Sequence, residues 1–178
     1  NFDGIGLVRD IEVNLGLPLA GRRVLLLGAG GATRGAVRPL ARAGAARIVI
    51  ANRTADKART LAAELAPHLD GVPLVGGGLA ALATGEAFEV VINATSASLS
   101  GAAPELPACA FAPGALAYDM VYGQGLTPFL RLARAAGCAR LADGVGMLVE
   151  QAAEAFAWWR GVRPDTREAL ARLTVPLA

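Results

Sequence analysis

Small residues capable of binding a phosphate stand together at Gly28-Ala29-Gly30-Gly31-Ala32, directly after an apolar run and before a helical pattern. A first glycine in such a loop permits a tight turn, and a second lets a pyrophosphate approach the backbone. The phosphates then accept hydrogen bonds from the free N–H groups at the start of the helix. Thr33 occupies the place of the usual third glycine. The spacing predicts a dinucleotide site, and the alternative is a glycine-rich turn without a ligand.

Polar and basic residues follow about 20 positions after the glycines, in Asn52-Arg53-Thr54 and Lys57. An NAD-selective site places a carboxylate here to bind the ribose 2′-hydroxyl, whereas a guanidinium binds a 2′-phosphate through paired hydrogen bonds. The segment therefore favours NADP over NAD as the cofactor. The alternative is that the cations only decorate a helix start, but the helix dipole disfavours cations at that position.

Three further polar or glycine-rich loops follow apolar runs. Asn93-Ala94-Thr95-Ser96 is the first, residues 118–123 with Met120 form the second, and residues 143–146 with Gly144 form the third. Ligands of open α/β sheets bind at the carboxyl ends of the strands, so these loops are predicted to share one edge. For the hydroxyl-rich loop, a simple helix cap remains the alternative.

The elements that must position these loops alternate between short apolar runs and helical stretches. This alternation is typical of βαβ units and a parallel sheet. It predicts an α/β fold, a Rossmann-type doubly wound six-stranded parallel sheet with flanking helices at both ends of the chain. The expected strands are 23–27, 47–51, 72–75, 89–93, 115–121 and 139–142. Pro39 falls inside the helix expected at 32–43, so we expect a kink or an early end near Arg38.

The composition is that of a globular domain, with 178 residues, 54% hydrophobic and 18% charged, and a net charge of +2. This balance excludes a disordered or strongly charged tail, and without a run of like charge we expect no nucleic-acid partner. No apolar stretch approaches the roughly 18 residues of a membrane span. Cys109 and Cys138 have no metal-ligand spacing, so no metal is expected. The chain opens with Asn1 and no secretory leader, and we expect it to be part of a longer protein.

Taken together, seven segments resemble the C-terminal, NADP-binding half of the shikimate dehydrogenase family. They are NFDGIG at 1–6, GAGGATRG at 28–35, NRT at 52–54, INATS at 92–96, YDMVY at 118–122, TPFL at 127–130 and DGVGMLVEQA at 143–152. The resemblance implies a cytoplasmic enzyme of aromatic amino-acid biosynthesis, which reduces 3-dehydroshikimate reversibly to shikimate with NADPH. A quinate/shikimate dehydrogenase-like paralogue and a non-catalytic NADP-binding module remain alternatives.

The resemblance also implies roles for single residues. Asp3 matches the catalytic aspartate, which works with a lysine from an N-terminal substrate domain that this chain lacks. Lys57, the only lysine here, is assigned to the cofactor phosphate, so the chain alone is expected to be inactive. Residues 28–32 would hold the pyrophosphate, and Asn52 to Lys57 the adenosine 2′-phosphate. The nicotinamide would be lined by Met120 and Gly144, and the substrate would be reached by Tyr122 and Gln151.

The same resemblance divides the chain into three parts. Residues 1–20 would be an inter-domain helix that carries Asp3, 21–144 the NADP-binding domain, and 145–178 helices that pack toward the missing domain. We therefore expect exposed apolar faces on the terminal helices, at Leu7, Ile11, Leu170 and Leu173. The sequence does not determine the oligomeric state, and a homodimer is one possibility.

Two positions depart from the family pattern. Phe2 stands where threonine is usual, and Ser98-Leu99 replaces Gly-Met. Both changes could alter the substrate preference.

Overall fold

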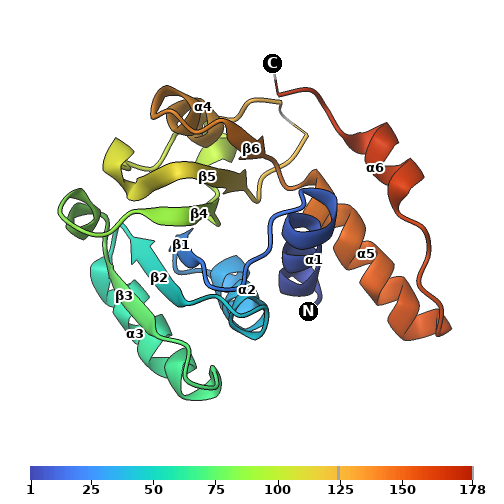
Figure 1. Ribbon diagram of the computed structural model, residues 1–178, viewed down its shortest axis with the longest axis horizontal. Helices are drawn as coiled ribbons and strands as arrows, with labels where there is room; N and C mark the ends of the chain where they lie inside the picture. Colours follow the sequence, from blue (N-terminus) through green and yellow to red (C-terminus); the bar gives the residue numbers. More distant parts are fainter. Residues whose placement is uncertain (124, 178) are drawn as a thin grey trace.

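Residues 1–123 and 125–177 are described by a computed structural model, apart from the side chains of Leu99 and Ser100. In this part of the chain six strands form one parallel sheet in the order β3-β2-β1-β4-β5-β6 (Figure 1). The order reverses between β1 and β4, as in Rossmann folds, which confirms the predicted fold class. The strands are β1 Arg23–Leu27, β2 Arg47–Asn52, β3 Leu74–Gly78, β4 Phe88–Asn93, β5 Phe111–Asp119 and β6 Arg140–Ala142.

Both faces of the sheet are buried, because successive side chains of each strand point to opposite sides. In β1, Val24 and Leu26 join one apolar cluster, while Leu25 and Leu27 join the other. The first cluster includes side chains of α1 (Asp3–Arg9), α2 (Gly31–Arg42) and α3 (Ala55–Leu65). The second includes α4 (Pro128–Ala135) and short 3-10 turns. The chain thus folds around one sheet with a helical layer on each face.

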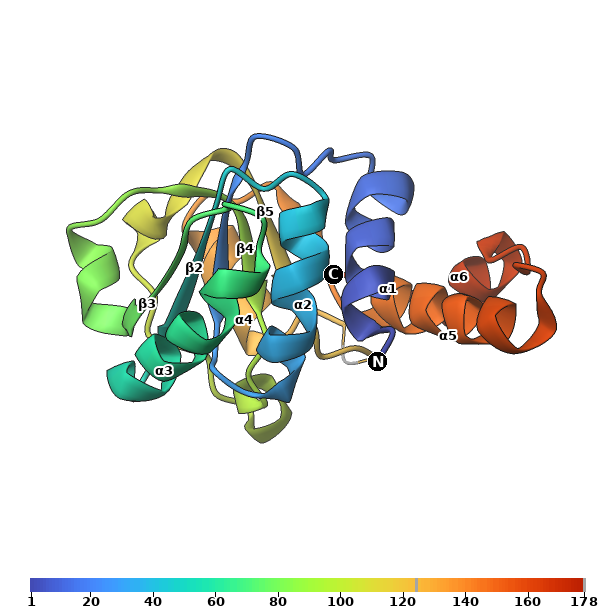
Figure 2. The ribbon, with the colours of Figure 1, turned by 90° about the horizontal axis from the view of Figure 1, so that it is seen from below.

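The first helix lies between α2 and α5 (Val145–Arg160), and α6 (Arg167–Leu173) lies beside α5 away from the sheet (Figure 2). After Arg9 the first helix continues as a π-helical turn, Asp10–Asn14. Glycines allow its close packing: a Cβ on Gly4 would lie 2.2 Å from the carbonyl oxygen of Gly35, and one on Gly6 would lie 2.7 Å from the amide of Gln151. No side chain larger than hydrogen fits at these contacts, so they fix the first helix against both neighbours.

The early end predicted for α2 near Arg38 is wrong, since the helix continues to Arg42, and the kink given as the alternative stays a prediction. A proline has no N–H to donate to the carbonyl four residues earlier, which belongs to Gly35. That carbonyl instead faces Gly4 of α1, and the ring of Pro39 also lies against Gly4. Proline is therefore tolerated because α1 covers the place where the helical hydrogen bond is missing.

The expected exposure of the first helix is also wrong. Leu7 and Ile11 are fully buried, because they face the sheet and pack in the cluster shared with α2 and α3. At the other end of the chain Leu173 is 50% exposed and Leu170 half-buried. The first helix is therefore part of the core of this chain.

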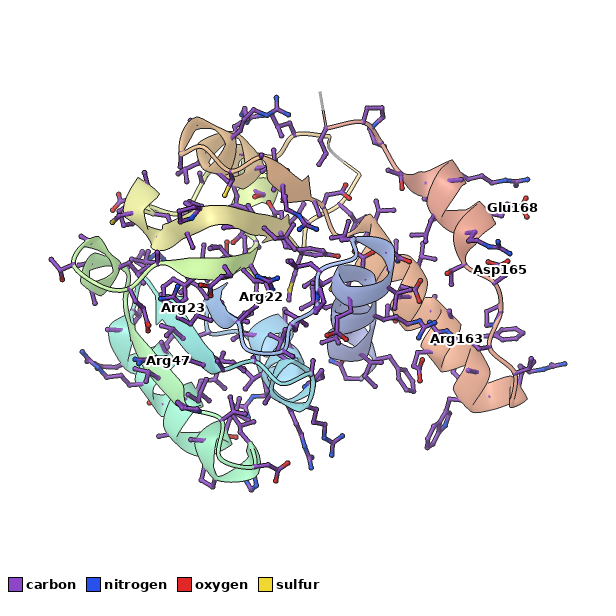
Figure 3. The ribbon with its side chains drawn as sticks, in the orientation of Figure 1. Arg22, Arg23, Arg47, Arg163, Asp165 and Glu168 are labelled. Atoms are coloured by element: carbon purple, nitrogen blue, oxygen red, sulfur yellow. The ribbon has the colours of Figure 1, made fainter. Side chains whose placement is uncertain are left out.

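The amino ends of the central strands are joined by ion pairs. The backbone N–H and the guanidinium of Arg23 both donate to Glu89, and Nε of Arg47 lies 3.0 Å from Oε1 of Glu86 (Figure 3). The hydrogen bonds from Arg23 lower the pKa of Glu89 to about 2. These contacts lie at the edge of the sheet opposite the carboxyl ends of the strands. Among the described residues, no helix has the length and apolar character needed to cross a membrane.

Candidate functional site

A cavity of about 800 Å³ opens at the carboxyl ends of β1, β2 and β4, beside the point where the strand order reverses. Its size falls within the range of small-molecule and cofactor pockets. Eight of the residues predicted for cofactor binding line it: Gly28, Ala29, Gly30, Asn52, Arg53, Thr54, Lys57 and Thr95. Segments that are distant in the sequence therefore meet at one cavity, at the edge where ligands of this sheet topology bind.

The glycine loop lies beside the cavity and leads into the first turn of α2. Gly28 has a φ of +104°, and a Cβ there would lie 2.9 Å from Cγ2 of Thr95. At Gly30 and Gly31 a Cβ would meet nothing within 4 Å, and α2 begins at Gly31. The first N–H groups of a helix lack partners within the helix and suit an anion. The buried hydroxyl of Thr33 donates to the carbonyl of Gly28 over 2.8 Å, so the residue at the third glycine position closes the loop.

The end of β2 carries positive charge without a carboxylate partner. In the part of the chain that the structure describes, neither Arg53 nor Lys57 has an acidic group within ion-pair distance. Neighbouring Arg59, by contrast, pairs with Asp56 over 2.8 Å. The side-chain amide of Asn52 donates to the carbonyl of Thr54 over 3.0 Å and shapes the turn. This end of the cavity can therefore accept a phosphate monoester.

Met120 and Gly144 lie against each other outside the cavity. A Cβ on Gly144 would lie 2.3 Å from the carbonyl oxygen of Met120, so only glycine permits this approach. The N–H of Met120 donates to the carbonyl of Asn93 over 3.0 Å, which joins the loops after β4 and β5. Asp143 accepts from the N–H of Val145 over 3.2 Å at the start of α5. The two residues predicted for the nicotinamide thus belong to one group of connected loops.

The three residues predicted to meet the substrate do not line the cavity. Asp3 is half-buried at the start of α1, and its backbone N–H donates to Oδ1 of Asn1 over 2.8 Å. Gln151 lies on the neighbouring helix α5, whose backbone contacts Gly6 one turn after Asp3. Tyr122 is 48% exposed in the loop after β5. The structure places Asp3 and Gln151 on adjacent helices, α1 and α5.

The ring of Phe2 packs on α5. Its centroid lies 6.3 Å from that of Trp158, with the ring planes tilted by 51°. The departure from the family pattern at this position therefore forms a contact between the start of α1 and the last turn of α5. Of the other departure, Ser98 is buried and the side chain of Leu99 lies outside the described part.

Sequence reasoning missed the buried polar groups that hold α1 in place. Asp10 is buried, and its carboxylate accepts hydrogen bonds from Asn14 over 2.8 Å and from Tyr118 over 2.7 Å. Burial raises the pKa of Asp10, and these two hydrogen bonds act in the opposite direction. Its position three residues after Leu7, on the apolar face of a helix, is the signal that could have identified it.

A second buried carboxylate, Glu150, joins α5 to the helices on either side of it. Arg9 donates to it over 3.0 Å, and Arg163, labelled in Figure 3, and Thr166 bind it from the segment before α6. Although burial acts to raise the pKa of Glu150, the hydrogen bonds from Thr166, Asn14 and Arg163 hold it below its usual range. The helices at both ends of the chain are thus connected through one carboxylate.

Two sequence profiles of a known family match this chain. The sequence profile described as "Shikimate / quinate 5-dehydrogenase" matches residues 11–100, and the profile "Shikimate 5'-dehydrogenase C-terminal domain" matches residues 144–173. The sheet order, the glycine loop and the cavity at the switch point define the class of Rossmann-type dinucleotide-binding proteins. Within that class, the chain belongs to the shikimate/quinate dehydrogenase family.

The relatives are longer than this chain. A curated protein of Dechloromonas aromatica, "Shikimate dehydrogenase (NADP(+))", is 61% identical over 99% of this chain and 63% of its own length. The crystal structure of an Ael1 enzyme from Pseudomonas putida has a TM-score of 0.92 and 61% identity, over 100% of this chain and 64% of that one. A shikimate dehydrogenase crystallised in complex with NADP+ has a TM-score of 0.76 and 30% identity, over 98% of this chain and 62% of that one.

Proposed function

We propose that this chain is the cofactor-binding part of an NADP-dependent shikimate dehydrogenase, which reduces 3-dehydroshikimate reversibly to shikimate. The observation that carries the proposal is the pair of unneutralised cations, Arg53 and Lys57, at the end of β2 beside the cavity. A 2′-phosphate needs positive charge at this place, where an NAD site would have a carboxylate. The name of the relative with 61% identity supports the same cofactor and substrate.

Different residues of the chain bind different parts of the cofactor in this proposal. The N–H groups of Gly30 and Gly31 and the start of α2 hold the pyrophosphate, together with Ala29 and Ala32 of the same loop. Asn52 and Thr54 shape the turn that places the cations against the 2′-phosphate. Met120 and Gly144 form the surface for the nicotinamide, and Thr95 lies between the two ends. When bound, the nicotinamide supplies or accepts the hydride of the reaction.

The proton of the reaction requires a group beside the substrate hydroxyl. Asp3 takes this role in the proposal, and Gln151 and Tyr122 bind the substrate. The only lysine of the chain, Lys57, lines the phosphate end of the cavity. The lysine that works with Asp3 is therefore assigned to sequence outside this chain, and the chain alone is expected to bind NADP without turnover.

The same proposal assigns three parts: 1–20 with Asp3, 21–144 as the NADP-binding domain, and 145–178 as helices that contact the rest of the protein. A set of exposed apolar side chains supports this division, and we name it the aromatic surface: Ile5 (41% exposed), Phe156 (43%), Trp158 (77%) and Trp159 (78%). It spans the start of α1 and the far half of α5, which projects from the body of the chain (Figure 2). An apolar surface of this kind is covered by a partner in most proteins. The occupant proposed here is the additional length that the relatives have.

The test uses the complete protein and this chain in parallel. The complete protein should oxidise shikimate with NADP+ in preference to NAD+, and the chain should bind NADP+ without catalysing the reaction. Quinate is the second candidate substrate, because the matching profile names both shikimate and quinate. A rate of quinate oxidation equal to that of shikimate oxidation would favour the quinate/shikimate dehydrogenase alternative. A complete protein that binds NADP+ but oxidises neither compound would identify a non-catalytic module. A cytoplasmic location is part of the proposal, since the pathway belongs to that compartment.

A further inference from the structure

One buried carboxylate lies beneath the loops of the candidate cofactor site. Asp119, the last residue of β5, is fully buried, and in the described part of the chain no cation pairs with it. Burial raises the pKa of its carboxyl, while hydrogen bonds from Thr127, Ser98, Val121 and Asn93 act to lower it. A buried charge is costly unless hydrogen bonds satisfy it, so these four donors are what keeps a carboxylate at this position.

The four donors come from three separate segments. Oδ1 of Asp119 accepts from the side-chain amide of Asn93 over 3.0 Å and from the N–H of Val121 over 3.1 Å. Its Oδ2 accepts from the hydroxyl of Ser98 over 2.7 Å and from that of Thr127 over 2.6 Å. Asn93 is the last residue of β4 and Ser98 lies in the loop after it, Val121 lies in the loop after β5, and Thr127 caps α4. One carboxylate therefore joins the end of β4, the loops after β4 and β5, and the start of α4.

The network extends to the cavity through Asn93. Its amide NH₂ faces Asp119 and Ser98, which leaves its oxygen for Thr95. That oxygen accepts from the N–H of Thr95 over 3.2 Å and from its hydroxyl over 2.7 Å. Thr95 lines the cavity and lies against the glycine loop at Gly28. Asp119 thus fixes the orientation of Asn93, and Asn93 fixes Thr95.

The network also reaches the nicotinamide side. Met120 follows Asp119 directly, and its N–H donates to the carbonyl of Asn93 over 3.0 Å. The next residue, Val121, donates its own N–H to Asp119. Met120 is therefore held on both sides by the network, although Asp119 does not itself line the cavity.

We propose that Asp119 is a positioning residue for the nicotinamide half of the cofactor site, and that Ser98 ties the loop after β4 to it. The inference rests on the proposed function, because it assigns these loops to the nicotinamide. Among the described residues, Arg53 and Lys57 of the adenosine half share no ion pair or hydrogen bond with this network, and their placement depends on β2 and α3. Loss of the network should therefore weaken the binding of the nicotinamide half of the cofactor and leave the binding of the adenosine half unchanged.

Two probes separate the halves: NADP+, which carries both, and 2′,5′-ADP, which carries only the adenosine 2′-phosphate half. In Asp119→Asn one carboxylate oxygen becomes an NH₂ group, so the variant loses the acceptor either for Ser98 and Thr127 or for Asn93 and Val121. We expect Asp119→Asn to weaken binding of NADP+ to this chain by roughly tenfold, since hydrogen bonds to charged groups are strong. Binding of 2′,5′-ADP should change by less than about twofold in the same variant. The fluorescence of bound NADPH reports the nicotinamide environment directly, and its enhancement on binding should fall.

Ser98→Ala removes a single hydroxyl and keeps the test valid should Asp119→Asn fail to fold. It should weaken NADP+ binding by about threefold and leave 2′,5′-ADP unaffected. Thr60→Ala, at an exposed position of α3, is the matched control and should bind both probes as the parent does. Equal losses for the two probes, or NADP+ binding equal to that of the parent, would overturn the inference. Failure of the parent chain to bind NADP+ at all would instead refute the proposed function.

Discussion

The phenol hydroxyl of Tyr118 donates a hydrogen bond to Oδ2 of Asp10 over 2.7 Å, deep between the sheet and the first helix. The phenol oxygen of Tyr118 in turn accepts a hydrogen bond from the N–H of Met147 over 3.2 Å. One side chain of β5 therefore holds both α1 and α5. Asp3 lies about two helical turns before Asp10, so Tyr118 determines where the proposed catalytic carboxylate stands relative to α5.

Tyr118→Phe removes this hydroxyl and leaves the buried carboxylate of Asp10 with one donor fewer. We expect the free energy of unfolding of the chain to fall by about 1 to 3 kcal/mol. Urea unfolding followed by circular dichroism measures it. Tyr122→Phe is the matched control, because Tyr122 is 48% exposed, and it should stay within about 0.5 kcal/mol of the parent.

The loss in Tyr118→Phe should depend on pH with a defined sign. The Tyr118 hydrogen bond lowers the pKa of Asp10 against the effect of burial, so the folded variant has a higher Asp10 pKa than the folded parent. The parent's advantage is therefore complete at pH values above both folded-state pKa values, and it declines as pH falls and Asp10 takes up a proton. Unfolding measured at about pH 7.5 and about pH 4.5 should give the larger difference at pH 7.5. A difference that grows toward acid would contradict the role given to this hydrogen bond.

Gly6 tests how closely α1 and α5 must approach. A Cβ on Gly6 would lie 2.7 Å from both the amide of Gln151 and the carbonyl of Met147, which are backbone atoms that cannot rotate away. Gly6→Ala should cost about 1 to 3 kcal/mol of stability. In the complete protein it should lower kcat while leaving NADP+ affinity unchanged, because it separates Asp3 from Gln151 without touching the cavity.

Gly77→Ala is the control for this substitution. A Cβ at Gly77 in β3 meets nothing within 4 Å, and its φ is not positive. Replacing a glycine in such a place is neutral or slightly stabilising. Equal losses in the two variants would mean that the cost at Gly6 comes from the loss of glycine itself and not from helix packing.

The sheet and the cofactor loops could be predicted from the sequence because their determinants are local. Each strand is a short apolar run, and each loop follows its strand directly, so the order of segments places the loops at one edge. The strand limits moved by a few residues: β5 begins at Phe111, ahead of the predicted 115, and β3 covers Leu74–Gly78 where 72–75 was expected. Those limits depend on pairing with neighbouring strands, which a single run does not contain.

The polar network and the placement of α1 could not be predicted in this way. Asp10 and Tyr118 are separated by 108 positions, and Asn93 and Asp119 by 26. The residues next to Asp10 in the sequence do not indicate that Tyr118 donates a hydrogen bond to it. The expected exposure of Leu7 and Ile11 follows from assigning the first helix to a contact with the missing domain, yet Gly4 and Gly6 let that helix pack into the body of the fold.

Arg53→Ala tests the choice between NADP and NAD. Arg53 has no acidic partner in the described residues, so its loss should not disturb an ion pair within the protein. We expect NADP+ binding to weaken by roughly 10- to 100-fold, as for a charge-assisted pair, and NAD+ binding to change little. Arg59→Ala, on the helix α3 that follows Arg53, is the control, because Arg59 pairs with Asp56. Titration of each variant with both nucleotides measures the effect, and equal losses for NADP+ and NAD+ would refute the assignment of Arg53 to the 2′-phosphate.

The aromatic surface predicts that one substitution has different effects in two forms of the protein. Trp159 is 78% exposed in this chain, so Trp159→Ser should change the stability of the chain by less than about 0.5 kcal/mol. In the complete protein the same change should lower the stability by about 2 to 4 kcal/mol, because a large aromatic side chain loses a buried contact. Val75→Ser, on the edge strand β3 and 44% exposed, is the control and should have the same small effect in both forms. Differential scanning calorimetry of both variants in both forms measures the change in stability, and an equally small effect of Trp159→Ser in both forms would show that the surface is not covered by the rest of the protein.

A second copy of the chain is the other possible occupant of the aromatic surface. Sedimentation of the chain at rising concentration tests it, since Trp159→Ser should abolish self-association only if a second copy binds there.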